Sequence, residues 1–69
     1  MSEETYGISE IVGTSKTSVD DAIRTAIAKA AENRRNIRWF EVTQVRGHVE
    51  NQQLAHFQVS LKLGYTLED

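Results

Sequence analysis

The sequence predicts one small α+β domain with a β-α-β-β order of elements. Three observations predict it: a β-rich segment closed by Gly13, a serine-capped helical pattern after Ser18, and an alternating apolar and polar pattern up to Tyr65. A chain of 69 residues without proline, linker or internal repeat is the length of one domain. We therefore assign residues 1–69 to a single unit.

The first predicted element is a strand from Thr5 to Ser15, a segment rich in residues that favour β structure. Its large apolar residues are Tyr6, Ile8, Ile11 and Val12. Glu10 interrupts the alternation of apolar and polar positions. We therefore expect this strand at an edge of the sheet or against a partner chain.

A helix is predicted to begin after Ser18, whose hydroxyl can accept a hydrogen bond from the free backbone amide of Asp21. The carboxylates of Asp20 and Asp21 oppose the positive end of the helix dipole, and Arg34 and Arg35 suit its C-terminal end. The predicted buried stripe consists of Val19, Ile23, Ala26, Ile27 and Ala30. This stripe is narrow and rich in alanine, which lets a sheet approach the helix closely.

The segment from Leu54 to Tyr65 is predicted to be a half-buried strand because its residues alternate in polarity. The apolar face carries Ala55, Phe57, Val59, Leu61, Leu63 and Tyr65, and the polar face carries His56, Gln58, Ser60 and Lys62. The segment 37–49 is its expected hairpin partner. The chain would reverse at residues 50–53, where Asn51 tolerates a positive φ best.

In the 37–49 strand, Phe40 and Val42 are expected to meet the helix, which sends Trp39 to the opposite face. That opposite face would also carry Glu41 and Thr43. Strict alternation beyond Val42 would point Gln44, Arg46 and His48 inward. Either a β-bulge corrects the alternation, or the hairpin extends past the helix. The second alternative agrees with the lengths of the elements, since a strand of about 13 residues spans about 43 Å and a helix of about 17 residues spans about 26 Å. Another subunit would cover such an extension.

The connection rules give the order of the strands. A right-handed strand-helix-strand crossover makes the first two strands parallel, so the third can lie between them with both neighbours antiparallel. The predicted sheet is thus three-stranded, with order 2-3-1 and one helix on one face. The other face carries Trp39 and Gln58, and no part of the chain remains to cover it.

The composition argues against several partners. Eight Lys and Arg against ten Asp and Glu give a net charge of -2 without a strong basic patch, so we expect no nucleic-acid binding. No apolar run approaches membrane-spanning length and the start lacks a secretory pattern, so we expect a cytoplasmic protein without a membrane partner. Without cysteine, and with His48 and His56 at no recognised ligand spacing, no metal site is predicted.

The exposed candidates have two interpretations each. Trp39 is either an anchor in a subunit interface or a platform for a planar ligand. Gln58 shares its face and is either solvated or, since it can both donate and accept hydrogen bonds, a contact for the edge of a heterocycle. Arg46, near the hairpin tip, is either solvated or a phosphate contact. No acid-base pair and no nucleophile motif is present, so catalysis is not predicted.

Four short motifs in register give the sequence a family resemblance: "EIVGTS", "WFEV", "RGH" and "HFQV". With the flanking segments they make the chain resemble the bacterial dodecins, which are small flavin-binding proteins, from Tyr6 to Glu68. The resemblance implies a sheet wrapped around the helix. It also implies that twelve copies close into a hollow shell, a homododecamer, so that the main partner of the chain is itself.

The resemblance also implies roles for three residues. Trp39 would stack on the isoalloxazine ring of a flavin, with two flavins paired between tryptophans of two subunits. Gln58 would hydrogen-bond the polar edge of the ring, and Arg46 would lie near the ribityl-phosphate side. Since Thr66 stands where many bacterial members have arginine, the choice between FMN and riboflavin stays open, as does binding of coenzyme A.

The function implied in this way is flavin storage, buffering and quenching without enzymatic turnover. A flavin-dependent oxidoreductase is the first alternative. The second is an empty structural shell in which Trp39 serves only as an interface anchor.

Overall fold

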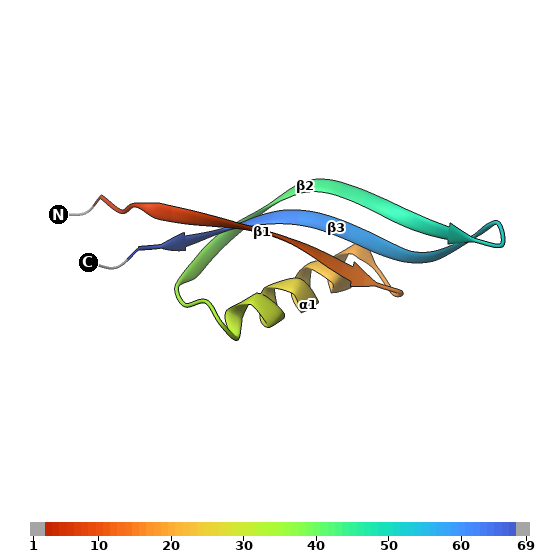
Figure 1. Cartoon of the computed structure of the whole chain (residues 1–69), viewed down its shortest axis with the longest axis horizontal. Coiled ribbons are helices and arrows are strands. Elements are labelled where there is room, and N and C mark those ends of the chain that lie inside the picture. Colours follow the sequence, from red (N-terminus) through yellow and green to blue (C-terminus); the bar gives the residue numbers. More distant parts are fainter. Residues whose placement is uncertain (1–2, 68–69) are drawn as a thin grey trace.

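The computed structural model describes residues 3–67 as three strands and one helix (Figure 1). The elements are β1 (Tyr6–Ser15), α1 (Val19–Ala31), β2 (Ile37–Glu50) and β3 (Gln53–Thr66). The predicted β-α-β-β order is confirmed. The expected domain over residues 1–69 also includes residues 1, 2, 68 and 69, and the resemblance extended to Glu68; these positions lie outside the described residues.

The strands form one antiparallel sheet in the order β1-β3-β2, as predicted. Both β1 and β2 are antiparallel to β3 and therefore run in the same direction, which the crossover through α1 requires. β1 lies at an edge, in agreement with the interruption of its pattern by Glu10. Figure 1 shows α1 beneath one face of the sheet.

The hairpin between β2 and β3 turns through Asn51 and Gln52, whose φ angles are 53° and 64°. Two consecutive residues with positive φ are typical of a type I′ turn, whose twist matches that of the flanking strands. The reversal at residues 50–53 and the positive φ of Asn51 are therefore confirmed. The second positive φ falls on Gln52, a residue type for which the left-handed backbone conformation is sterically unfavourable.

A β-bulge at Thr43 corrects the alternation of β2. Val42 pairs with Leu61, but the next pair is Gln44 with Ser60, so Thr43 is an extra residue. Beyond the bulge Arg46 lies opposite Gln58, on the face away from the helix. The hairpin also extends past the start of α1, as Figure 1 shows, and the molecule is 55 Å long. Both explanations offered for the sequence pattern thus hold.

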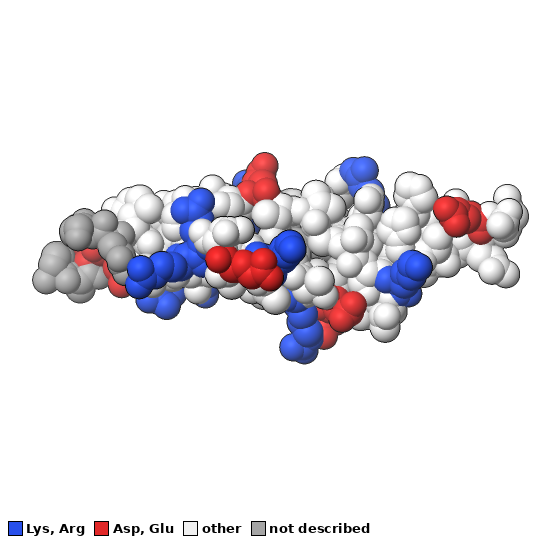
Figure 2. All heavy atoms as spheres, turned by 60° about the horizontal axis from the view of Figure 1, so that its bottom comes forward, with Lys and Arg blue, Asp and Glu red and all other residues white. Residues whose placement is uncertain are grey.

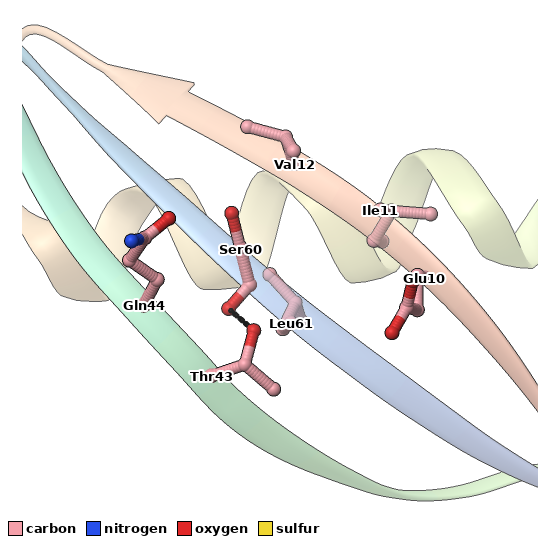
Figure 3. A pocket seen from close by; sticks show the side chains of 7 residues that line it. All are labelled: Glu10, Ile11, Val12, Thr43, Gln44, Ser60 and Leu61. Carbon is pink, nitrogen blue, oxygen red and sulfur yellow. Dashed lines mark hydrogen bonds between the residues drawn. The ribbon is translucent and has the colours of Figure 1, made fainter.

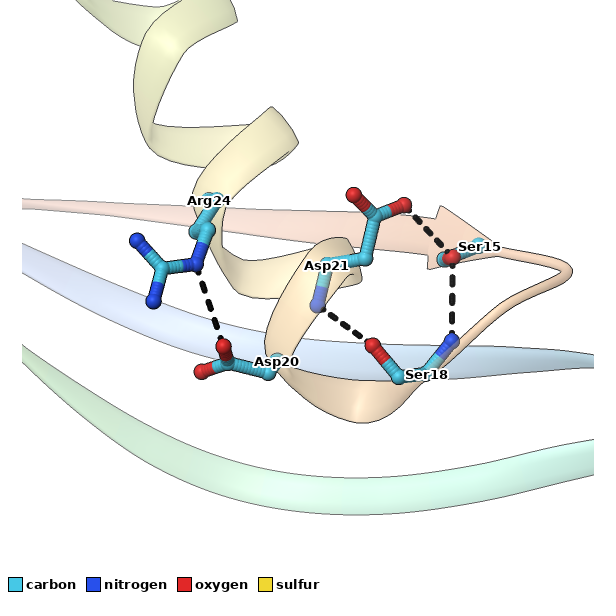
Figure 4. A network of polar contacts seen from close by, with 5 residues as sticks. All are labelled: Ser15, Ser18, Asp20, Asp21 and Arg24. Carbon is cyan, nitrogen blue, oxygen red and sulfur yellow. Dashed lines mark hydrogen bonds and ion pairs between the residues drawn. The ribbon is translucent and has the colours of Figure 1, made fainter.

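The start of α1 is fixed by a serine and aspartate network (Figure 4). Ser18 accepts a hydrogen bond from the Asp21 backbone N–H at 2.9 Å, as predicted. The buried Ser15 hydroxyl donates to Asp21 Oδ2 at 2.7 Å and accepts from the Thr17 and Ser18 amides at 2.9 and 3.3 Å. The end of β1 and the first turn of α1 are thereby held together.

The end of α1 differs from the expectation. The helix stops at Ala31 with Glu32 as its cap, so Arg34 and Arg35 lie in the link to β2 and not in the last helical turn. The Arg34 guanidinium instead lies over the Tyr65 ring, 3.9 Å from its centroid. This cation–π contact joins the link to β3.

The core is small. Its buried apolar residues are Ala22, Ala26, Val59, Leu61 and Leu63. Gly13 lets α1 approach β1 closely, because a Cβ there would overlap the Ala22 carbonyl oxygen and lie 2.8 Å from Ala26 Cβ. Ala22 is fully buried, although it lies outside the predicted stripe.

The expectation that Phe40 and Val42 meet the helix is wrong. They lie on the helix side of the sheet, opposite Leu63 and Leu61, but remain 47% and 37% exposed. The reason is that the main contacts of α1 are with β1 and β3. Beyond Ile37, which packs against the core, the helix side of β2 is therefore an exposed apolar surface.

Candidate functional site

The sheet face away from α1, which we call the outer face, carries the candidate residues. The rows of this face that include all three strands run from the Trp39 end, where Ile8 and Trp39 flank Gly64, to the row where Thr14 and Arg46 flank Gln58. The intervening rows are Glu10 with Lys62 and Glu41, and Val12 with Ser60 and Gln44. No other described element packs on this face.

Trp39 lies across Gly64 of β3. A Cβ on Gly64 would overlap three atoms of the six-membered ring of the indole, Cε2, Cζ2 and Cδ2. The Tyr6 ring meets the indole edge-on from β1, with centroids 6.1 Å apart and planes at 62°. One side of the indole thus rests on backbone, one edge on Tyr6, and the side chain is still 38% exposed. This is a fixed aromatic platform that faces solvent.

Gln58 and Arg46 form a second group toward the hairpin. They are direct cross-strand partners, with Gln58 half-buried and Arg46 exposed. Arg46 Nη2 donates to the side-chain oxygen of Gln44, the preceding outer-face residue on β2. The guanidinium is thereby directed along the strand and keeps further N–H groups for an anion.

The two groups lie far apart within one chain. Trp39 pairs with Gly64, which is six residues along β3 from Gln58. At about 3.3 Å per strand residue the separation is about 20 Å. The structure therefore brings Arg46 to Gln58, but it does not bring Trp39 to either of them in the same protomer.

A depression of about 410 Å³ lies between these groups (Figure 3). Its lining includes Glu10 and Val12 from β1, Thr43 and Gln44 from β2, and Ser60 from β3. The short Ser60 side chain leaves the centre of the outer face low, and Thr43 Oγ1 donates to the Ser60 carbonyl at 3.1 Å. The depression therefore has mixed walls, with a carboxylate and an amide near an exposed valine.

The charges do not favour one sign. Figure 2 shows Lys and Arg interspersed with Asp and Glu on the helix side of the molecule. On the outer face Lys62 stands between Glu10 and Glu41. Within residues 3–67 there is no group of three or more His, Cys, Asp and Glu able to hold a metal, and no helix with the length and apolarity needed to cross a bilayer.

Sequence reasoning missed Gly64 and Tyr6 as parts of the tryptophan platform. A glycine inside a strand costs stability unless a neighbour uses the space it leaves, and here the indole fills that space. The signal was a glycine near the end of the alternating strand. It could not be read without the pairing register, because the sequence does not state which residue of β2 faces Gly64.

The fold and the outer face define a class of protein: a one-helix β-α-β-β protein with a small core and an exposed aromatic platform on an uncovered sheet. The family model for dodecin matches residues 5–68. The chain therefore belongs to the dodecin family, and the resemblance noted in the sequence is confirmed.

Individual relatives agree with this assignment. The dodecin of Thermus thermophilus is 38% identical over 60 residues, which is 87% of each chain. The solved dodecin of Streptomyces coelicolor superposes with a TM-score of 0.93 at 54% identity, covering 100% of this chain and 99% of its own. The dodecin of Streptomyces davaonensis gives 0.92 at 46% identity, with 99% and 100% covered.

Proposed function

We propose that this protein is a cytoplasmic flavin-binding shell of twelve identical chains that stores flavin and quenches its excited state. The observation that carries the proposal is the Trp39 platform: one side of the indole rests on Gly64, and the side chain remains exposed. A bound isoalloxazine supplies a planar aromatic surface with a polar edge. The exposed indole and the amide of Gln58 fit these two features.

Stacking is the first source of affinity. An aromatic pair contributes about 0.5–1.5 kcal/mol beyond the burial of its area. Trp39 enters this contact with its orientation already restricted by Gly64 and Tyr6, so little side-chain entropy is lost on binding. Gln58 would add orientation through hydrogen bonds, and Arg46 would contact the phosphate of FMN.

The distance between Trp39 and Gln58 supports a site between subunits. A single flavin ring does not span about 20 Å, so a ligand that contacts both residues must take them from two copies of the chain. The exposed apolar residues support assembly as well. They include Tyr6, Ile8 and Val12 on the outer face and Phe40, Val42, Val45 and Leu54 on the hairpin.

Quenching follows from the contact between the rings. Trp39 in van der Waals contact with an excited flavin donates an electron to it, and the electron then returns to the indole without emission of light. A flavin pair enclosed between two tryptophans leaves no open face for a second substrate. Storage and protection therefore agree with this arrangement better than turnover does.

A flavin titration together with a mass measurement tests the proposal. Riboflavin and FMN are added to the purified protein while flavin and tryptophan emission are recorded, and the particle mass is measured in solution. We expect strong loss of both emissions, saturation near one flavin per chain, and a mass of about twelve chains. A monomer, or a particle that leaves flavin emission unchanged, contradicts the proposal. Rapid oxidation of a reduced nicotinamide by the flavin-loaded particle would indicate an oxidoreductase instead.

A further inference from the structure

The outer face carries a pair of histidines that the proposed flavin contacts do not use. His48 of β2 and His56 of β3 are direct cross-strand partners in the row that follows Arg46 and Gln58. Their rings are stacked, with centroids 4.9 Å apart and planes only 9° from parallel. His48 is exposed and His56 half-buried, so the pair is open to solvent at one end of the outer face.

Two adjacent imidazoles are a donor set for a divalent transition metal. Neutral imidazole is the commonest metal ligand among side chains, and it suits copper, nickel and zinc. Metal–nitrogen bonds of about 2.0–2.1 Å place two neighbouring ligand nitrogens about 3 Å apart. Directly opposed strand residues already have Cβ atoms about 5 Å apart. Rotation of each ring about χ2, a broad torsion in histidine, brings one nitrogen of His48 toward one of His56.

The surroundings select the kind of cation. Arg46 occupies the preceding row on β2, and Lys16 lines a cavity of about 270 Å³ together with Thr14, Ser15 and His56. The positive charges of Arg46 and Lys16 oppose every divalent cation alike, so the ligand type makes the selection. Calcium and magnesium require several oxygen ligands, and the described residues hold no carboxylate cluster that would supply them. A borderline metal gains its affinity from bonds to nitrogen. The cavity beside His56 leaves room for water as a further ligand.

We propose that His48 and His56 form a two-imidazole site for a divalent transition metal, with the affinity order Cu²⁺ above Ni²⁺ and Zn²⁺. The site is separate from the flavin contacts, since the metal ligands are neither Trp39, Gln58 nor Arg46. It therefore stands or falls independently of flavin binding.

The test uses the assembled, flavin-free protein without a polyhistidine tag. Cu²⁺ is titrated calorimetrically, and the copper-loaded protein is examined by electron paramagnetic resonance. We expect one saturable Cu²⁺ per chain and hyperfine coupling to two imidazole nitrogens. Ca²⁺ serves as the negative control, and it should produce no saturable heat.

Matched variants separate this site from other copper-binding groups, such as the terminal amine. His48→Phe and His56→Phe keep an aromatic ring in each position but remove the nitrogen ligands, and each should abolish the saturable binding. Glu41→Gln, on the same face but outside the pair and its neighbouring row, should leave it unchanged. Copper binding that persists in both phenylalanine variants, coupling to a single nitrogen, or no binding at all overturns the proposal. Equal particle mass for all variants shows that the assembly is intact.

Discussion

The indole of Trp39 occupies the space that the missing side chain of Gly64 leaves on the outer face of the sheet. Trp39 and Gly64 are cross-strand partners, and the indole can pack against the backbone of β3 because residue 64 has no side chain. The ring is thereby presented to solvent in a fixed orientation. The proposed flavin site depends on this relationship.

Trp39→Ala should weaken flavin binding by at least about tenfold, because it removes both the stacking and the apolar area that the ring would bury. The variant should keep the particle mass, since Trp39 lies outside the buried core. Titration of FMN with fluorescence detection measures the effect. Trp39→Phe is the matched control and should retain part of the affinity. Unchanged binding in the alanine variant would show that Trp39 has no stacking role.

Gly64→Ala should also weaken flavin binding, although residue 64 need not touch the ligand. The new methyl group would overlap the indole and displace it from β3. We expect a shift of the tryptophan emission of the flavin-free protein and a loss of about 1 kcal/mol in flavin affinity. Equal emission spectra and equal affinities for the variant and the parent would show that the packing of the indole against Gly64 does not hold the ring in place.

Mixed particles can show whether the site draws on two chains. Particles that contain both Trp39→Ala and Gln58→Ala chains have some interfaces that join an intact Trp39 to an intact Gln58. If the two residues act from different subunits, a mixed particle should bind flavin more tightly than either parent variant. Co-expression with two different affinity tags yields such particles. A mixed affinity equal to the average of the parents would place both residues in one subunit's site.

Thr66→Arg should improve the binding of FMN more than that of riboflavin. Thr66 pairs with Tyr6, whose ring contacts Trp39, so an arginine there would lie beside the platform. A guanidinium attracts the phosphate that riboflavin lacks. The ratio of the two dissociation constants measures the effect, with Thr66→Gln as the uncharged control. An equal gain for both flavins would exclude a phosphate contact.

Gly13→Ala should lower the free energy of unfolding by about 1–3 kcal/mol. The added Cβ would collide with the backbone of α1 at Ala22 and force the helix away from β1. Gly47→Ala is the matched control. Its Cβ would lie 3.0 Å from the flexible end of Leu54 and 3.7 Å from the His56 carbonyl oxygen, which is an ordinary contact distance. Thermal unfolding of both variants at equal concentration compares them. Equal melting temperatures would show that the close contact of α1 with β1 does not limit stability.

Local patterns in the sequence determined much of the fold. The capping serine Ser18, the alternation up to Tyr65 and the turn at Asn51 depend on neighbouring residues, so they can be read along the chain. The order of the strands followed from general connection rules. The exposure of Trp39 on the face away from the helix was predicted by the same alternation.

Only the tertiary structure decided the register between the strands, and with it which distant residues meet. The bulge at Thr43 turns Arg46 toward Gln58, and the same register seats Trp39 on Gly64 and stacks His48 on His56. These pairings depend on the fit of whole strands to each other and to the helix, which a periodic pattern leaves undetermined. The sequence alone therefore predicted the face on which Trp39 and Gln58 lie, while the face of Arg46 and the distances between the three residues required the folded chain.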